Sequence, residues 1–440
     1  MTRIILRIPE SLYHQIRADL IRPHEFAGER AGFCFARSKV LFKEEIIICL
    51  NDYKTIADED YIDNPEVGAQ FGERPINEAI GHGFEHRKSV FHVHMHEFSS
   101  SDPQFSWTDL EGLPPIAESC SRIIQDEVHG LLLLSRSNLN ALVWLPNEST
   151  PVLVDQITVG GSPMNVSFPL NPLHRLQLER YNRQSFLGEY SEALFARLRI
   201  GVVGLGGGGS HVVQQLAHIG IRNFVLFDDD RIDESNLNRL VGATLRDKED
   251  GTLKFDIAKR VISNLHMDFD VKGGAIKWEE SPEHLQSCDI VVGCVDSLDA
   301  RRSLEAECRR YLIPYVDIGM GIDRPVQKAP YIYGQVHLSL PENACLICKN
   351  LLNPDDLKKE AEKYGEIGGR PQVVWPNGAL ASTAVGVVVD LITGWTSNSD
   401  RNLHLTYDGN EFEMGKSIFA DSYSGFCPHY PVGQSGPLNM

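Results

Sequence analysis

The feature that most constrains the fold is a glycine-rich turn between an apolar strand and a helix, within residues 199–239. The strand leads into the loop 204–210, and a second strand ends in the acidic triplet 228–230, followed by the box 235–239. This order is that of a nucleotide-binding βαβ unit, because glycines let backbone N–H groups approach a polyphosphate at a helix N-terminus. The stretch therefore predicts a nucleotide site in an α/β fold.

The residues around and after the acidic triplet separate an ATP site from a nicotinamide site. Asp228 would suit the ribose of either cofactor. Arg239 and Lys254 add two cations for a triphosphate, and Asp296, at the end of another apolar strand, adds a carboxylate for its magnesium. A hydride-transfer enzyme has no need of that set, so ATP and Mg²⁺ are the expected cofactors.

These ordered motifs resemble those of the ThiF/MoeB/HesA adenylyltransferases, relatives of the ubiquitin-activating enzymes, over residues 178–430. The match begins with Arg180-Tyr181-Asn182-Arg183-Gln184, and continues through the glycine loop and the Ser-Asn-Leu-Asn-Arg box to Asp296 with Arg301. The resemblance implies a Rossmann-like, doubly wound adenylation domain. The residues that it implies for ATP and magnesium are Gly204, Gly206, Gly207, Gly209, Asp228, Asp230, Asn236, Arg239, Lys254 and Asp296.

The resemblance also implies the reaction. The C-terminal glycine carboxylate of a ubiquitin-like or sulfur-carrier protein would attack the α-phosphate and give an acyl-adenylate and pyrophosphate. No side-chain nucleophile is needed, since positioning and charge neutralisation supply most of the catalysis. Asp296 and Arg183 are the implied catalytic residues, and Arg183 is implied to reach the ATP of the other subunit. A homodimer is therefore expected, with a conjugating enzyme or acceptor protein as a further partner.

The N-terminal half carries a second candidate site in the histidines of residues 92–96. His94 and His96 are two residues apart on a predicted strand, so they point to the same side and suit one metal ion. A carboxylate from Asp109 would give two nitrogens, one oxygen and an open position, the pattern of a catalytic zinc. Glu29, before a Gly-apolar strand, is the candidate general base.

These residues resemble the signature of the JAMM (JAB/MPN) metalloproteases over residues 25–146. The resemblance implies that His94, His96 and Asp109 bind zinc, that Glu29 is the acid/base, and that Ser106 helps to hold the oxyanion. Fused to an activating domain, such a peptidase would process precursors of the modifier or remove it from its target.

Several alternatives stay open in this half. The gap between His96 and Asp109 is longer than usual, Glu97 stands where proline is common, His92 permits a shifted register, and Glu25 is a second candidate base. The cluster could also be a metal-free strand end, or a degenerate domain kept for binding.

A third cluster contains Cys345-Leu346-Ile347-Cys348 and, near the end, Cys427-Pro428-His429-Tyr430. A C-x-x-C turn offers two thiolates to one tetrahedral zinc. The family's second pair is Cys-Pro-x-Cys, but Tyr430 takes the last position here. We therefore predict a structural zinc on Cys345, Cys348 and Cys427, with His429 or an outside group as the fourth ligand. Buried free thiols are the alternative.

A thioester cysteine is missing from its usual place, because the crossover segment 349–378 contains no cysteine. Either the adenylate passes directly to an acceptor, or another thiol such as Cys294 or Cys308 serves. Direct transfer is preferred, since Cys294 lies on an apolar strand where packing is the commoner role.

Length and composition bound the remaining choices. The 440 residues are divided into a JAMM-like domain (1–160), a linker (161–177) and an adenylation domain (178–440). A net charge of −18 disfavours nucleic acid or an anionic membrane as the main partner. Nine cysteines without disulfide spacing, and no apolar run near 18 residues, favour a cytoplasmic protein. The rivals are an enzyme that adenylates a small peptide or metabolite with a noncatalytic N-terminal recognition domain, and a noncatalytic scaffold.

Overall fold

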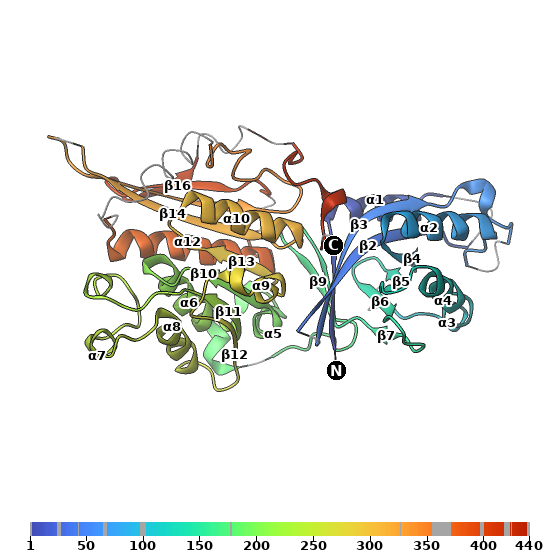
Figure 1. Ribbon diagram of the computed structural model, residues 1–440, viewed down its shortest axis with the longest axis horizontal. Helices are drawn as coiled ribbons and strands as arrows, with labels where there is room; N and C mark the ends of the chain where they lie inside the picture. Colours follow the sequence, from blue (N-terminus) through green and yellow to red (C-terminus); the bar gives the residue numbers. More distant parts are fainter. Residues whose placement is uncertain are drawn as a thin grey trace.

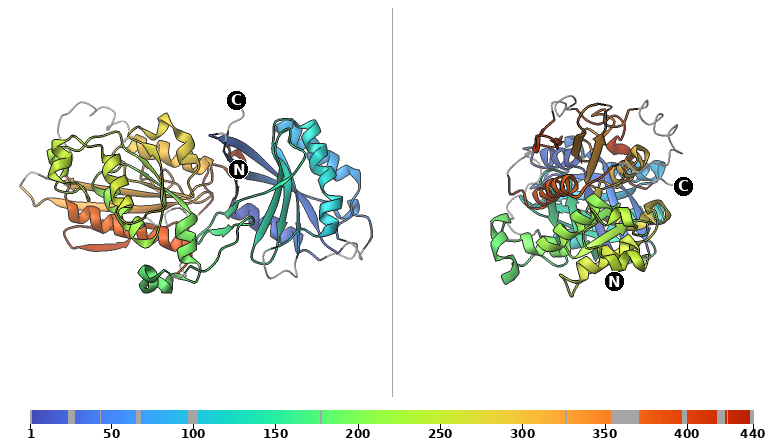
Figure 2. Two further views of the ribbon diagram at one scale, coloured as in Figure 1. Left: turned by 90° about the horizontal axis from the view of Figure 1, so that it is seen from below. Right: turned by 90° about the vertical axis from the view of Figure 1, so that its left-hand side faces the viewer.

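The computed structural model has two α/β lobes, each built around one large sheet (Figures 1 and 2). It describes residues 2–23, 28–42, 44–64, 68–96, 103–176, 178–325, 327–353, 371–396, 400–417, 423 and 425–437. The mixed α/β fold class predicted from the sequence is confirmed.

The N-terminal lobe is a nine-stranded mixed sheet of order β7-β6-β5-β4-β2-β3-β1-β8-β9. Helix α1 packs on one face, while α2 and α4 pack on the other. Its elements are β1 (Arg3–Ile8), α1 (Glu10–Leu20), β2 (Ala31–Leu41), β3 (Glu45–Thr55), η1 (Asp58–Asp60), α2 (Glu73–His86), β4 (Ser89–Met95), α3 (Trp107–Gly112), α4 (Pro114–Ile123), β5 (His129–Leu134), β6 (Leu139–Trp144), β7 (Val152–Leu153), β8 (Gln156–Val159) and β9 (Asn165–Ser167).

Strand β9 lies in the stretch 161–177 that the sequence predicted to be a linker, and β8 comes just before that stretch. Strand β8 pairs in parallel with β1, and β9, which falls within residues 161–177, pairs antiparallel with β8. The β1–β8 pairing joins segments about 150 residues apart, which local composition does not reveal. The sheet of the N-terminal lobe therefore extends to Ser167.

The C-terminal lobe is an eight-stranded sheet of order β12-β11-β10-β13-β14-β15-β16-β17. The first five strands are parallel and the last three add antiparallel to them. Its elements are η2 (Glu179–Leu187), α5 (Ser191–Arg197), β10 (Arg199–Val203), α6 (Gly207–Ile219), β11 (Asn223–Phe227), η3 (Glu234–Asn236), α7 (Leu245–Glu249), α8 (Lys254–Ser263), β12 (Asp270–Gly274), η4 (Trp278–Glu280), α9 (Pro282–Gln286), β13 (Ile290–Gly293), α10 (Leu298–Arg310), β14 (Tyr315–Asp323), β15 (Tyr331–Ser339), α12 (Val374–Thr393), β16 (His404–Asp408), β17 (Glu413–Lys416) and η6 (Val432–Gln434).

The strand order places a site at one edge of this sheet. Sequential strands β10, β11 and β12 run outward to one side and β13 and β14 to the other, as in a doubly wound Rossmann-type fold. In such sheets a ligand binds outside the carboxyl ends of the strands, where the order reverses. That point lies between the ends of β10 and β13.

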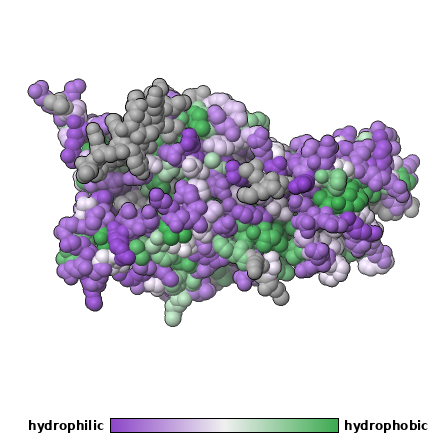
Figure 3. All heavy atoms as spheres, in the orientation of Figure 1, coloured by the Kyte–Doolittle hydropathy of each residue, from purple (hydrophilic) through white to green (hydrophobic). Residues whose placement is uncertain are grey.

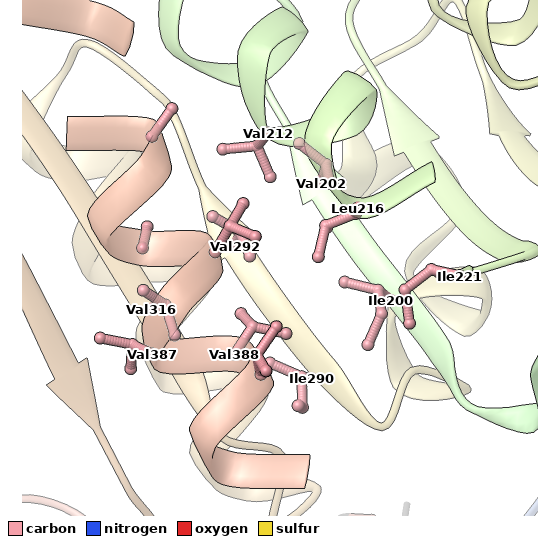
Figure 4. Close-up of a cluster of buried hydrophobic side chains, with 14 of the residues drawn as sticks. Ile200, Val202, Val212, Leu216, Ile221, Ile290, Val292, Val316, Val387 and Val388 are labelled. Atoms are coloured by element: carbon pink, nitrogen blue, oxygen red, sulfur yellow. The ribbon is translucent and has the colours of Figure 1, made fainter. Parts of the chain in front are cut away.

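Helix α12 forms the centre of the core on one face of this sheet. Val387 and Val388 pack toward Val292 and Val316 of the sheet (Figure 4). Among the described residues, α12 alone is long and apolar enough to cross a membrane, and 61% of its apolar window is buried in the lobe. The sequence had suggested no apolar stretch of this length. The face of the molecule seen in Figure 3 is mainly hydrophilic.

A buried seam joins the two lobes. Ile5 and Ile47 of the N-terminal sheet share one apolar cluster with Leu304 of α10. Arg7 donates to the carbonyl oxygens of Tyr311 and Cys288, each at 2.8 Å. The two lobes are therefore packed together through apolar contacts and hydrogen bonds as well as being covalently linked.

Removing the buried carboxylate of Glu45 is expected to destabilise this seam. Its oxygens lie 2.9 and 3.0 Å from Nη1 of Arg199, and Arg3 Nη1 is 3.3 Å away. Glu45→Gln would leave buried guanidinium groups without their anion, which costs about 3–5 kcal/mol. Denaturant unfolding should show that loss, whereas Glu44→Gln at the exposed neighbouring position should change the free energy of unfolding by less than about 0.5 kcal/mol. If Glu45→Gln had the same free energy of unfolding as the wild type, the charge pair would not be needed for stability.

Candidate functional site

The glycine turn after β10 is built by two close backbone approaches. Gly204 has a φ of +86°, and a Cβ atom there would lie 2.6 Å from the carbonyl oxygen of Cys294. A Cβ atom on Gly209 would lie 1.8 Å from the carbonyl oxygen of Gly204. Side chains at these positions would force the turn open. The turn therefore needs glycine, and it brings the N-terminus of α6 to the carboxyl ends of β10 and β13.

A cavity of about 730 Å³ lies at this point. Every residue predicted for ATP and magnesium lines it except Gly209, which is buried inside α6. Arg183 does not line the cavity of its own chain and is exposed. The predicted residues on the cavity wall are Gly204, Gly206, Gly207, Asp228, Asp230, Asn236, Arg239, Lys254 and Asp296.

The acidic strand end and Lys254 form one charge cluster. Asp228 accepts hydrogen bonds from the backbone N–H groups of Leu205 (2.6 Å) and Asp230 (3.0 Å). Burial raises the pKa of Asp228, and the nearby Lys254 works against that rise. Lys254 Nζ lies 2.5 Å from Asp230 Oδ2 and 3.6 Å from Asp228 Oδ1. The ammonium group is thus held beside the cavity by two acids.

The box 235–239 is shaped by its own caps. The carboxylate of Asp233 accepts from the backbone N–H groups of Ser235 (2.7 Å) and Asn236 (3.2 Å), which orients the first turn. Arg239 donates to the carbonyl oxygen of Ser235 at 2.5 Å and to Gln372 Oε1 at 3.1 Å. Two cationic side chains, Arg239 and Lys254, therefore border a cavity that begins at a helix N-terminus, which suits a polyphosphate.

Some cavity residues were missed by the sequence reasoning. Trp278 and Lys277 come from the turn after β12, Gln372 comes from the segment before α12, and Asn377 comes from the start of α12. None belongs to a recognisable motif, and only the fold brings them to the glycine turn. Arg301, by contrast, was part of the motif; it lines the cavity, and its Nη1 donates to Asp317 Oδ2 at 3.1 Å.

The N-terminal cluster assembles four of the predicted groups. His94 Nε2 lies 3.3 Å from Asp109 Oδ1, and His96 Nε2 lies 3.4 Å from Asp109 Oδ2. Glu29 Oε1 lies 3.8 Å from His96 Nε2. Ligand atoms of Glu29, His94 and His96 lie within 4.8 Å of one another. Apart from the approach of Nε2 to Asp109, the buried ring nitrogens of His94 have no hydrogen-bond partner in the described part of the chain.

Electrostatics in this cluster favour an ionised Asp109. Burial acts to raise the pKa of Asp109, but the imidazoles of His94 and His96 outweigh it and hold the pKa well below its usual range. Burial raises the pKa of Glu29, while the two imidazoles oppose the rise. A carboxyl group with a raised pKa beside a metal-ligand set is suited to exchange protons.

The other predicted groups of this cluster have different surroundings. Ser106 is the N-cap of α3, and its Oγ accepts from the backbone N–H of Asp109 at 3.1 Å, which places Asp109 toward the histidines. His92 lies deeper and stacks on Phe71, and burial lowers its pKa to about 3. The geometry thus puts His94 and His96, rather than His92, at Asp109. Glu25 and Glu97 lie outside the described residues.

The third cluster brings three thiols and one imidazole together. Cys345 Sγ lies 3.6 Å from Cys348 Sγ, which lies 3.8 Å from Cys427 Sγ. His429 Nδ1 is 3.4 Å from Cys345 and Cys348 and 3.9 Å from Cys427. A tetrahedral zinc with Zn–S bonds of about 2.3 Å separates its sulfur ligands by about 3.8 Å. The four groups therefore fit a tetrahedral site, and Tyr430 instead packs its ring near the guanidinium of Arg309.

Comparison with known proteins agrees with the C-terminal site. A SAMP-activating enzyme E1 of Haloferax volcanii is 31% identical over 182 residues, which are 40% of this chain and 63% of that protein. Ubiquitin-like modifier-activating enzyme 5 of Mus musculus is 26% identical over 193 residues, 40% of this chain and 44% of that protein. The matches thus span less than two thirds of either relative.

Solved structures give a weaker likeness. Escherichia coli MccB with ATP aligns with a TM-score of 0.46 at 20% identity, over 59% of this chain and 75% of that chain. The microcin C7 biosynthetic enzyme MccB in complex with N-formylated MccA aligns with a TM-score of 0.48 at 20% identity, over 58% and 75%.

The sheet order, the glycine turn and the lined cavity define a Rossmann-type nucleotide-binding lobe. The ThiF family profile matches residues 181–424, more than half of the sequence. The chain belongs to the ThiF family, which confirms that part of the resemblance found in the sequence.

Proposed function

We propose that the C-terminal lobe uses ATP to adenylate the C-terminal glycine of a ubiquitin-like or sulfur-carrier protein. The main support is the cavity at the point where the strand order reverses, because the glycine turn, Arg239, Lys254 and Asp296 all line it. Its similarity to a SAMP-activating enzyme and to a ubiquitin-like modifier-activating enzyme supports this substrate class. Asp228 would bind the ribose, and Arg239 and Lys254 would neutralise the phosphates.

The magnesium that accompanies ATP would be held by carboxylate and amide oxygens of Asp296 and Asn236, a donor set of the kind that Mg²⁺ prefers. When bound, the ion neutralises phosphate charge. The remaining catalytic work falls to the protein, which aligns the glycine carboxylate with the α-phosphate and excludes water.

Pyrophosphate exchange into ATP tests this proposal. Exchange that depends on a modifier with a Gly-Gly tail, and not on a free peptide or metabolite, would support it. Exchange with a free peptide or metabolite alone would favour the rival small-molecule enzyme, and no exchange with any carrier would favour a noncatalytic scaffold.

We propose further that the N-terminal lobe is a JAMM-like zinc isopeptidase. His94, His96 and Asp109 would hold the zinc, which supplies Lewis-acid chemistry when bound. Glu29, beside His96, would move the proton, and Ser106 would help to hold the oxyanion. Cleavage of a C-terminally extended modifier, and its block by a zinc chelator, would test this activity; a chelator-insensitive or absent cleavage would favour a noncatalytic recognition domain.

Transfer from the adenylate is proposed to be direct. Cys294 has a pKa raised to about 12 by burial, and burial also raises the pKa of Cys308 well above that of a free thiol. Both thiols are thereby poor nucleophiles near neutral pH. An acceptor protein would then receive the activated carboxyl group. We propose that these reactions take place in the cytoplasm.

A homodimer with Arg183 acting across the interface is proposed, and subunit mixing tests it. Arg183 is exposed and does not line the cavity of its own chain, while Phe186 and Trp395 form an exposed aromatic pair with ring centroids 5.7 Å apart. Arg183→Ala and Asp296→Ala should each lose exchange activity. When the two variants are mixed under conditions where subunit exchange is proven, each heterodimer should regain up to one active site. No recovery of exchange activity would exclude the cross-subunit role of Arg183.

A further inference from the structure

Asn377 is a buried amide that reaches the nucleotide cavity from the first turn of α12. Only 5% of the residue is exposed, yet it lines the cavity. Its Nδ2 donates to the carbonyl oxygen of Val373 at 2.9 Å, the one hydrogen bond that its amide makes among the described residues. A primary amide has two N–H donors and a carbonyl acceptor. One donor and the acceptor are therefore available toward the cavity.

The amide lies directly against the glycine turn. A Cβ atom on Gly207 would come within 2.6 Å of Asn377 Nδ2 and 3.2 Å of Arg239 Cδ, and one on Gly208 would come within 3.8 Å of Asn377 Oδ1. Gly207 is the first residue of α6, where free backbone N–H groups would meet the phosphates of a bound nucleotide. Asn377 and Arg239 thus both lie beside Gly207 at the glycine turn, and Asn377 comes from α12.

The chemistry of the amide suits a carboxylate better than a phosphate. The charge of the triphosphate is already met by Arg239, Lys254 and the N-terminus of α6, all from residues 204–254. A neutral amide can orient a carboxylate through one N–H without pairing it with a cation, which would lower its nucleophilicity. Its carbonyl oxygen can at the same time accept from the N–H of the terminal glycine.

We propose that Asn377 is a positioning residue that holds the terminal glycine of the substrate against the α-phosphate. This rests on the adenylation proposed above. A carboxylate oxygen forms a bond to the α-phosphorus, the bond from that phosphorus to the bridging oxygen breaks, and pyrophosphate leaves with that electron pair. Asn377 changes no bond and takes no proton. It sets the direction of attack.

Two nucleotide probes test the assignment by equilibrium binding to the full chain. Glycylglycyl-sulfamoyladenosine mimics the acyl-adenylate, and adenosine 5′-sulfamate has the same nucleoside without the acyl group. Asn377→Ala should weaken binding of the first about tenfold to hundredfold, the worth of hydrogen bonds to a polar acyl group, and leave the second within about twofold. Asn377→Asp, which replaces a donor by an anion, should lose at least as much. Ser382→Ala, exposed on the same helix, is the matched control.

The outcomes separate the two proposals. An equal loss for both probes would place Asn377 on the phosphate and overturn the assignment, as would no loss for either. Wild-type protein that binds the two probes equally would instead contradict adenylation of a glycine terminus. A thermal unfolding curve unchanged from the wild type shows that each variant is folded, and Asn377→Gln, which keeps the amide one methylene further out, should restore part of the acyl selectivity.

Discussion

Asp296→Ala is expected to lower modifier-dependent pyrophosphate exchange by about a thousandfold or more while leaving cleavage of a modifier precursor intact. Asp296 follows β13 at the switch point of the sheet and lines the nucleotide cavity. Removing the carboxylate that would hold magnesium leaves the developing phosphate charge without its main counter-ion, and losses of this size follow from removing such electrostatic groups. Initial exchange rates at saturating ATP measure the effect.

The matched control is Asp299→Ala, which removes the same charge three residues away. Asp299 is exposed, pairs with Arg302 at 2.6 Å and does not line the cavity. Exchange within about twofold of wild type is expected for this variant, since exposed ion pairs contribute little. A comparable loss in both variants would point to a general effect of charge or folding.

The converse change is Glu29→Gln, which should abolish precursor cleavage and leave exchange unchanged. Glu29 lies beside His96 in the N-terminal lobe, and Gln keeps its shape but cannot carry a proton. Glu118→Gln, half-exposed on α4, is the control and should keep both activities. If either Asp296→Ala or Glu29→Gln eliminated both activities in folded protein, the two-site hypothesis would be wrong.

The sequence predicted those parts of the fold whose signal is local. The glycine loop and the acidic strand end placed the cavity. These signals are backbone constraints, such as the positive φ of Gly204, which only one residue type satisfies easily.

What the sequence did not reveal depends on contacts between distant segments. Strand β8 exists because it pairs with β1, and the seam depends on pairs such as Arg7 with Tyr311, 304 residues apart. Asn377 reaches the glycine turn only because α12 packs on α6. Such residues carry no motif, so their part in a site can be seen only after folding.

Zinc content is expected to be about two ions per chain, each lost separately. His94→Ala/His96→Ala should remove one ion and precursor cleavage. Cys345→Ser/Cys348→Ser should remove the other, because His429 and Cys427 alone cannot complete a tetrahedral site. Elemental analysis of purified, unchelated protein measures both. His218→Ala and Cys120→Ser, outside both clusters, should keep the wild-type content.

The two losses should differ in their effect on stability. The sulfur site holds together segments about 80 residues apart, and the C-terminal segment that follows it reaches the N-terminal lobe: Asn51 Nδ2 donates to the carbonyl oxygen of Ser435 at 3.0 Å. The free energy of metal binding at such a site adds to the stability of the folded state. The cysteine variant should therefore unfold at lower denaturant concentration and expose residues 425–437 to proteolysis. The histidine variant should leave both properties near those of wild type, since its ligands come from β4, the residue after it and α3, all within one lobe. If the protein held a single zinc ion that was lost only in the cysteine variant, the N-terminal lobe would be a binding domain that does not cleave the modifier precursor.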